Sequence, residues 1–159
     1  MKKIISIGLV CLTLLVAQAV FAQEPNSEDR GSVTGNMTRV FAKPGEPKLT
    51  DFVTFEHGQV RYNRRQWAIF TTATFQRQTP YRFTRAPMWI KYNERTGLLT
   101  ISIIGENRKQ WTLNNHPNVE VTIADDRSTL NLKFTGDVEA NREGGHYNWM
   151  KDSWLRATR

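Results

Sequence analysis

The segment from Trp67 to Phe75 constrains the fold of this chain more than any other feature. Its side chains are mostly β-branched or aromatic, and Trp67, Ile69, Thr71, Ala73 and Phe75 alternate with Ala68, Phe70, Thr72 and Thr74. Successive side chains of a β-strand point to opposite faces of the sheet, so a period of two is typical of a strand with one face in the core. The segment therefore predicts a half-buried β-strand.

Further strands and turns follow at short spacing. Gln76–Pro80 has the composition of a turn, and a second strand is expected over Tyr81–Arg85 and Pro87–Tyr92. We expect that strand to bend at its proline, because proline cannot donate a hydrogen bond to a central ladder. Asn93–Gly97 predicts a hairpin turn whose final glycine adopts a positive φ.

The remaining apolar runs extend the same pattern. A third strand is expected over Leu98–Ile104, a fourth over Val119–Ala124, and a long fifth over Thr129–Ala140. Asp125–Ser128 between the last two predicts another tight turn. Hairpins at this short spacing indicate an antiparallel barrel rather than a parallel sheet.

Helices are expected at three places beside these strands. Leu49–His57 fits a short helix ended by Gly58, and a second short helix is expected between strands three and four. A C-terminal helix is expected within Glu143–Arg159, where the apolar positions fit an amphipathic pattern (Tyr147, Trp149, Met150, Trp154 and Leu155). The predicted fold class is therefore mainly β with minor α.

The first 22 residues have the features of a secretory signal peptide. Lys2 and Lys3 precede an apolar run over Ile4–Val16, and Val20-Phe21-Ala22 offers small residues for cleavage before Gln23. The alternative is a membrane anchor, but the run is shorter than the roughly 20 residues of a spanning helix. Val10 before Cys11 does not fit a lipoprotein signal. We expect a periplasmic or secreted protein without stable membrane insertion after cleavage.

Cleavage would change the composition of the mature chain. It removes Cys11, the only cysteine, and with it any disulfide, thiolate nucleophile or cysteine-based metal site. Without Lys2 and Lys3, 20 Lys and Arg residues oppose 15 Asp and Glu residues, a net charge of +5. Export argues against a nucleic-acid partner. Residues 23–48 are polar and read as a flexible lead-in, which leaves residues 49–159 as one folded domain.

Arg108 and Lys109 are candidate ligand-binding residues. They follow the third expected strand and stand where a short helix is expected to begin. Free backbone N–H groups at a helix start and neighbouring cationic side chains both favour a phosphate group. The alternative interpretation is a solvated basic pair at the end of a loop.

The same segment resembles a known family. Arg108-Lys109, Leu113 and Asn115-His116-Pro117-Asn118-Val119 are similar to the "RKxxnLxxnPxV" segment of the pyridoxamine-phosphate-oxidase-like, or flavin-reductase-like, split β-barrels. Three more generic likenesses accompany it, in Trp67–Ala73, Pro87–Tyr92 and Leu130–Glu139. The first hairpin departs from the family pattern, because Gln76–Pro80 keeps only the proline of the usual Gly-x-Pro turn.

The resemblance implies a split β-barrel, a cofactor and a partner. In the family, the basic pair commonly contacts the phosphate of FMN or a deazaflavin, and the flavin ring lies in a groove of a homodimer. By this resemblance Arg108 and Lys109 would bind the phosphate, Trp89 would stack on the ring, and Thr71 and Thr72 would reach its polar edge. The alternatives are a core or interface tryptophan and ordinary strand threonines.

Other chemistries find less support in the sequence. His57, His116 and His146 are far apart and form no metal-binding motif, so no metal site is expected. No catalytic acid, base or nucleophile can be named. Two function classes remain. The first is an exported protein that binds FMN or a similar phosphate-bearing cofactor, a class that includes flavin-dependent oxidoreductases. The second is a cofactor-free envelope or virulence-related interaction protein on the same fold. Haem binding is a third option without an evident axial ligand.

Overall fold

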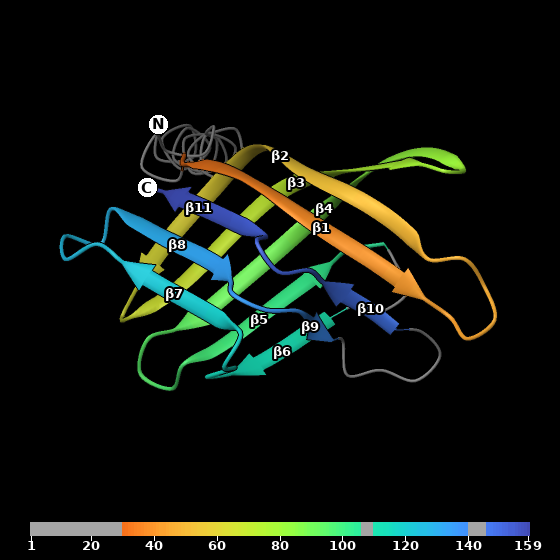
Figure 1. The fold of residues 1–159 in the computed structure, drawn as a ribbon. Coiled ribbons are helices and arrows are strands. Elements are labelled where there is room, and N and C mark those ends of the chain that lie inside the picture. The colour runs from red at the N-terminus through yellow and green to blue at the C-terminus, as the bar shows by residue number, and fades with distance from the viewer. Residues whose placement is uncertain (1–29, 106–109, 140–145) are drawn as a thin grey trace, which may run out of the picture.

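The computed structural model describes residues 30–105, 110–139 and 146–159, and every regular element in these ranges is a β-strand (Figure 1). The strands are β1 (Ser32–Ala42), β2 (Leu49–Asn63), β3 (Gln66–Gln78), β4 (Tyr81–Asn93), β5 (Leu98–Ile103), β6 (Gln110–Asn114), β7 (Val119–Ile123), β8 (Thr129–Phe134), β9 (Val138–Glu139), β10 (His146–Trp149) and β11 (Trp154–Thr158). The described part of the chain holds no helix that could cross a lipid bilayer.

The strands form one curled antiparallel sheet in the order β6-β5-β4-β3-β2-β1-β11-β8-β7. Strand β1 joins the two ends of the chain, because it pairs with β2 on one side and with β11 and β10 on the other. Strands β6 and β7 stand at the two ends of the order, and no ladder among the described residues joins them. The sheet is therefore a half-barrel, as Figure 1 shows.

The core lies on the concave side of this sheet. In β3 the residues Trp67, Ile69, Ala73 and Phe75 are buried on that side, while Ala68 and Phe70 between them are exposed. The period of two in this segment is thus confirmed as a half-buried strand. Aromatic contacts connect distant strands across the core, since the rings of Trp111 on β6 and Trp149 on β10 lie 5.2 Å apart.

Both predicted tight turns are present. Strand β4 ends at Asn93 and β5 begins at Leu98, and Gly97 between them has a φ of 72°, which a residue with a side chain rarely adopts. The other turn joins β7 to β8, where Asp126 accepts hydrogen bonds from the backbone and hydroxyl of Ser128. These turns form because asparagine, aspartate, serine and glycine satisfy the backbone locally.

Strand β4 runs through Pro87 without an interruption of its pairing with β3. Pro87 is the ladder partner of Thr72 in β3. Its carbonyl oxygen points to the other side, toward β5, and accepts a hydrogen bond from the backbone N–H of Ile104. The N and C=O of one strand residue point to the same side, so the missing N–H of Pro87 falls where the β5 ladder ends. The two segments expected as a single second strand are thus one continuous strand, β4, which includes Ala86 and Pro87.

The helix predictions are corrected by the structure. Leu49–His57 belongs to β2, which pairs with β1 and β3 along its length. Between strands three and four, the described residues from Gln110 onward form β6, which pairs with β5, and no helix. The expected C-terminal helix is replaced by β10 and β11. Two short strands bury Trp149 and Leu155 just as an amphipathic helix would, so the pattern of apolar residues did not distinguish strands from a helix.

Two predicted boundaries also change. The stretch of residues 23–48, expected as a flexible lead-in, contains β1, which has partner strands on both sides. The long fifth strand over Thr129–Ala140 is divided into β8 and β9, because the chain turns at Gly136 and β9 pairs with β10 instead of β11. Its last residue, Ala140, lies outside the described residues.

Candidate functional site

The convex face of β2, β3 and β4 carries a cluster of aromatic and cationic side chains. The ladder sets Gln59 of β2 beside Phe70 of β3, and Phe70 beside Trp89 of β4. One row further along, Arg61, Ala68 and Lys91 are neighbours in the same way. All six side chains belong to the face that points away from the core.

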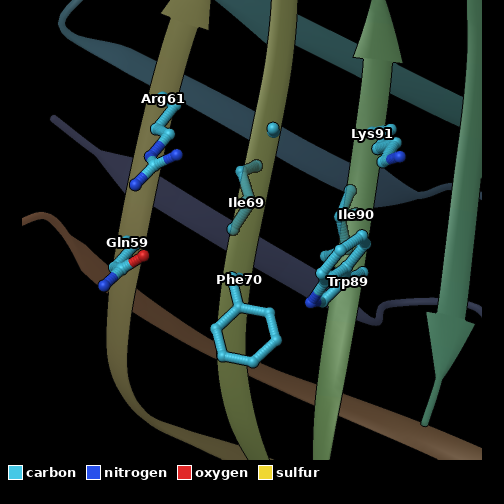
Figure 2. A pocket seen from close by; sticks show the side chains of 8 residues that line it. Gln59, Arg61, Ile69, Phe70, Trp89, Ile90 and Lys91 are labelled. Atoms are coloured by element: carbon cyan, nitrogen blue, oxygen red, sulfur yellow. The ribbon is translucent and has the colours of Figure 1, made fainter. Parts of the chain in front are cut away.

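Ala68 creates a hollow at the centre of this cluster. Its side chain is a single methyl group, whereas the residues around it are long or aromatic. The Cα atoms of Arg61 and Lys91 are separated by two strand spacings, about 10 Å in a regular sheet, and the space between them stays open above Ala68. The hollow has a volume of about 330 Å³. Figure 2 shows its labelled side chains, from Gln59 and Arg61 on β2 to Lys91 on β4.

The two aromatic rings of the cluster are held in a defined arrangement. Phe70 and Trp89 meet edge to face, with ring centroids 5.7 Å apart and an interplanar angle of 77°. The ammonium group of Lys91 lies 5.1 Å from the centroid of Trp89, within the range of a cation–π interaction. Phe70 is 39% exposed and Trp89 42% exposed, so both rings still offer surface to a ligand.

A second hollow of about 460 Å³ adjoins the first, and Gln59 and Phe70 line both. Its remaining lining comes from the two residues before β1 (Arg30 and Gly31), from a β-bulge in β2 where His57 has a φ of 49° (His57 and Gly58), and from β3 (Thr71 and Thr72). Gly58 permits the close approach of β1, because a Cβ atom there would lie 2.4 Å from a methyl group of Val33. The bulge therefore requires glycine at position 58, and its residues form one wall of the second hollow.

Thr71 stabilises the bulge through its hydroxyl. The Oγ1 atom donates to the backbone carbonyl of His57 at 2.7 Å and lies 3.3 Å from the carbonyl of Glu56. Thr71 is buried, whereas the next residue, Thr72, is half-buried and lines the second hollow. The hydroxyl of Thr71 is thus engaged with the backbone, and Thr72 is the threonine with access to a ligand in this hollow.

The structure places three of the five predicted site residues around the two hollows. Trp89 lines the first, and Thr71 and Thr72 line the second. Arg108 and Lys109 lie outside the described residues, so their predicted contact with a phosphate stays a prediction. The sequence named the tryptophan and the threonines as contacts of one flavin, and the β3–β4 ladder places them at two adjoining hollows.

Sequence reasoning missed Gln59, Arg61, Ala68 and Lys91. A signal for them was present, because the alternation that buries Trp67 places Ala68 and Phe70 together on the other face. The charge pattern was a second signal: residues 57–93 contain seven arginines and lysines and no aspartate or glutamate. Only the strand register, however, shows that Arg61 and Lys91 flank the same alanine.

Asp51 and Glu94 have shifted pKa values, and neither residue lines these two hollows. Burial alone would raise the pKa of Asp51, but hydrogen bonds from Arg77 and Arg39 outweigh it and hold the pKa below its ordinary value. Glu94 likewise has a lowered pKa, because hydrogen bonds from Trp67 and Arg127 outweigh the effect of burial. Among the described residues no group of three His, Cys, Asp or Glu side chains could hold a metal ion.

Comparison with known proteins adds no assignment to this geometry. No family model, no curated protein and no solved structure matches this chain.

Proposed function

We propose that this protein binds a planar, negatively charged small molecule in the hollow above Ala68, and that FMN is the candidate ligand. The observation that carries the proposal is the row of Arg61, Ala68 and Lys91 beside the exposed rings of Phe70 and Trp89. Aromatic side chains offer surface to a ring system, and an arginine and a lysine offer charge-assisted hydrogen bonds to a phosphate.

The resemblance of the Arg108–Val119 segment to flavin-binding split barrels is what selects FMN among such molecules. A bound flavin would supply redox chemistry, and the residues around the hollow would bind and orient it. The Arg61 guanidinium matches a phosphate bidentately, while Lys91 acts as a point charge already close to Trp89. No side chain of the described residues is assigned a proton-transfer role.

The test is an FMN titration of the purified protein, followed by quenching of flavin fluorescence. Ala68→Phe fills the hollow without removing any charge or any core contact, because Ala68 is exposed on the convex face. Thr122→Phe is the matched control, since Thr122 is an exposed residue of β7 and lines none of the hollows described here. We expect Ala68→Phe to weaken FMN binding by about tenfold or more, or about 1.4 kcal/mol, and Thr122→Phe to leave it unchanged.

Two results would count against this site. Equal FMN affinity in the wild type and in Ala68→Phe would place the ligand elsewhere. Absence of FMN binding by the wild type would favour the second candidate, a cofactor-free interaction protein of the cell envelope. That candidate has its own support, because exposed aromatic side chains continue past the hollow to Phe52 and Phe83 on the same face of the sheet.

A further inference from the structure

The outer edge of β2 is paired along only part of its length. Strand β1 pairs with residues 49–53 of β2, and a single bridge then joins Gly31 to Gly58. Beyond that bridge, over residues 59–63, no ladder among the described residues lies on this edge, although β3 pairs with the other edge over the same residues. This part of β2 therefore has room for one more strand.

Val60 directs its backbone groups to this edge. The carbonyl oxygen of Gly58 points there, because it accepts a hydrogen bond from the N–H of Gly31 at 3.1 Å. Backbone groups alternate in direction along a strand, so the N–H and C=O of Val60 point the same way. Val60 is 1% exposed, and a buried backbone N–H or C=O requires a hydrogen-bond partner. A continuation of β1 before Gly31 would supply both partners.

The segment that precedes Gly31 in the chain is acidic. Residues 23–29 contain Glu24, Glu28 and Asp29 and no lysine, arginine or histidine. The part of the chain that it would meet is basic, because residues 57–93 carry seven arginines and lysines and no aspartate or glutamate. Opposite charges on neighbouring strands attract, so the segment and this side of the sheet complement each other in charge.

The register of the bridge determines which residues meet. Continued by one residue, it sets Arg30 beside Gln59, and these two residues line the second hollow together. Continued by two more, it sets Glu28 beside Arg61. Partners in an antiparallel ladder point to the same face of the sheet, so Glu28 and Arg61 would form an ion pair on the convex face.

The length of the segment also matches the open edge. Residues 26–30 are as many as residues 59–63, so they would cover the edge up to the β2–β3 turn. Pro25 would end the pairing at that turn, because proline has no N–H to donate to a ladder. The match in length, charge and register commits this edge to a segment of the same chain.

We propose that residues 26–30, the N-terminal strap, continue β1 along the outer edge of β2 and that Glu28 pairs with Arg61. The strap then stands at the Arg61 end of the hollow above Ala68. It competes with an anionic ligand for the same guanidinium, a consequence that rests on the proposed function. The binding of the strap to β2 is independent of that function.

The test joins the strap to β2 by an engineered disulfide. Glu28→Cys with Arg61→Cys is introduced in a Cys11→Ser background, so that the chain contains no other cysteine. Neighbours in an antiparallel ladder have Cα atoms about 4.5–5.5 Å apart, within the range of a disulfide. The matched control is Glu28→Cys with Lys91→Cys, because Lys91 lies on the same face two strand spacings beyond Arg61, about 10 Å further on.

Oxidation of the purified protein is followed by the loss of free thiols and by intact mass. We expect the Glu28–Arg61 pair to form its disulfide at least about tenfold faster than the control pair, because the strap holds it at a high effective concentration. Equal rates for the two pairs, or no disulfide in either, would overturn the proposal. A disulfide that links two copies of the chain would overturn it in favour of a second copy at this edge.

An FMN titration tests the competition separately. Glu28→Gln removes the charge that pairs with Arg61, so its affinity for FMN should rise by about threefold or more over the wild type. Glu120→Gln, at an exposed position of β7, is the control and should leave the affinity unchanged. Equal affinity in Glu28→Gln and the wild type would overturn the competition. No FMN binding by either protein would refute the proposed function, while the disulfide rates still decide whether the strap binds β2.

Discussion

Arg127 donates from Nε to Oε1 of Glu94 at 3.0 Å, and this ion pair connects the β7–β8 turn to the turn between β4 and β5. The same carboxylate oxygen accepts a hydrogen bond from Nε1 of the buried Trp67, also at 3.0 Å. The two turns are 33 residues apart in the chain. Glu94 therefore connects the β4–β5 hairpin to the β7–β8 hairpin at one end of the half-barrel, although these two hairpins are not hydrogen-bonded to each other in the sheet.

Removal of the Glu94 carboxylate should destabilise the protein. Glu94→Ala leaves the indole N–H of Trp67 without its acceptor in a part-buried position, which costs about 1–3 kcal/mol. Glu94→Gln keeps an acceptor for Trp67 and loses the charge, so its destabilisation should be smaller. Urea unfolding of both variants checks the order, and a Glu94→Ala protein as stable as the wild type would show that the network contributes nothing.

The same residue predicts how stability depends on pH. Burial alone would raise the pKa of Glu94, but the hydrogen bonds from Trp67 and Arg127 hold it below the ordinary value of 4.5. A carboxyl with a lowered pKa in the folded state contributes stability above its unfolded pKa, and this contribution is lost as the pH falls through the folded pKa. We expect the melting temperature to fall below about pH 4.5, with a shallower fall in Glu94→Gln. Melts from pH 7 to pH 2.5 provide the measurement, about 2 units on either side of that value.

Asp51 stabilises the other end of the half-barrel. It accepts hydrogen bonds from Arg39 on β1 and Arg77 on β3, at distances of 2.8–3.2 Å, and all three side chains are buried. Asp51→Ala should destabilise the fold by about 3–5 kcal/mol, because it leaves buried guanidinium charges without their carboxylate. Asp125→Ala is a control at an exposed turn and should stay within about 0.5 kcal/mol. Equal urea midpoints for the two variants would contradict the role of Asp51.

Arg108 and Lys109 remain predicted phosphate ligands. If they bind the phosphate of FMN, Arg108→Ala with Lys109→Ala removes charge-assisted hydrogen bonds worth about 1.5–3 kcal/mol each, and the affinity falls at least tenfold. The FMN titration of this double variant should be compared with that of Ala68→Phe. A loss in the double variant alone would place the phosphate at the basic pair, and a loss in Ala68→Phe alone would place the ligand in the hollow.

Export is a prediction from the first 22 residues. The mature protein should begin at or near Gln23 and be found in the periplasm or the medium. Intact-mass analysis of protein from cell fractions checks both points. Soluble protein that retains Met1 to Ala22 would contradict the signal-peptide interpretation.

A homodimer is the predicted assembly, and the structure changes the residues on which it rests. From the sequence, Trp89, Trp149 and Trp154 are expected to need a partner surface. In the structure Trp149 is buried inside the chain, whereas Trp89 and Trp154 are 42% and 41% exposed. If Trp154 of β11 lies in a dimer interface, Trp154→Ser should weaken dimerisation by about tenfold or more, since burial of a large aromatic contributes about 1.5–3 kcal/mol. Light scattering across a concentration series tests this, with Leu98→Ser as the control. A wild type that is monomeric at every concentration would remove the dimer.

Local patterns were sufficient where a residue's neighbours along the chain decide its structure. The alternation from Trp67 to Phe75 predicted β3, and the asparagine and glycine of Asn93–Gly97 predicted the turn before β5. In each case the physical cause is short-range: side chains of a strand alternate, and turn residues satisfy their own backbone.

The strand register decided the composition of the candidate site. Arg61 and Lys91 are 30 positions apart in the sequence, and nothing near either of them indicates that Ala68 lies between them. A shift of one residue in either ladder would send one of these side chains to the core face. The hollow is therefore a property of two aligned ladders and could not be assembled from residue types.

The sequence by itself determined that this chain folds into antiparallel strands with one apolar face, and it located several of the turns. Only the tertiary structure decided that residues 32–42 form a central strand and that the C-terminal residues form β10 and β11 in place of a helix. The reason is that β1 gains its hydrogen bonds and burial from β2, β10 and β11, and the last two lie at the far end of the sequence. A polar segment such as this becomes a strand through partners that local periodicity does not contain.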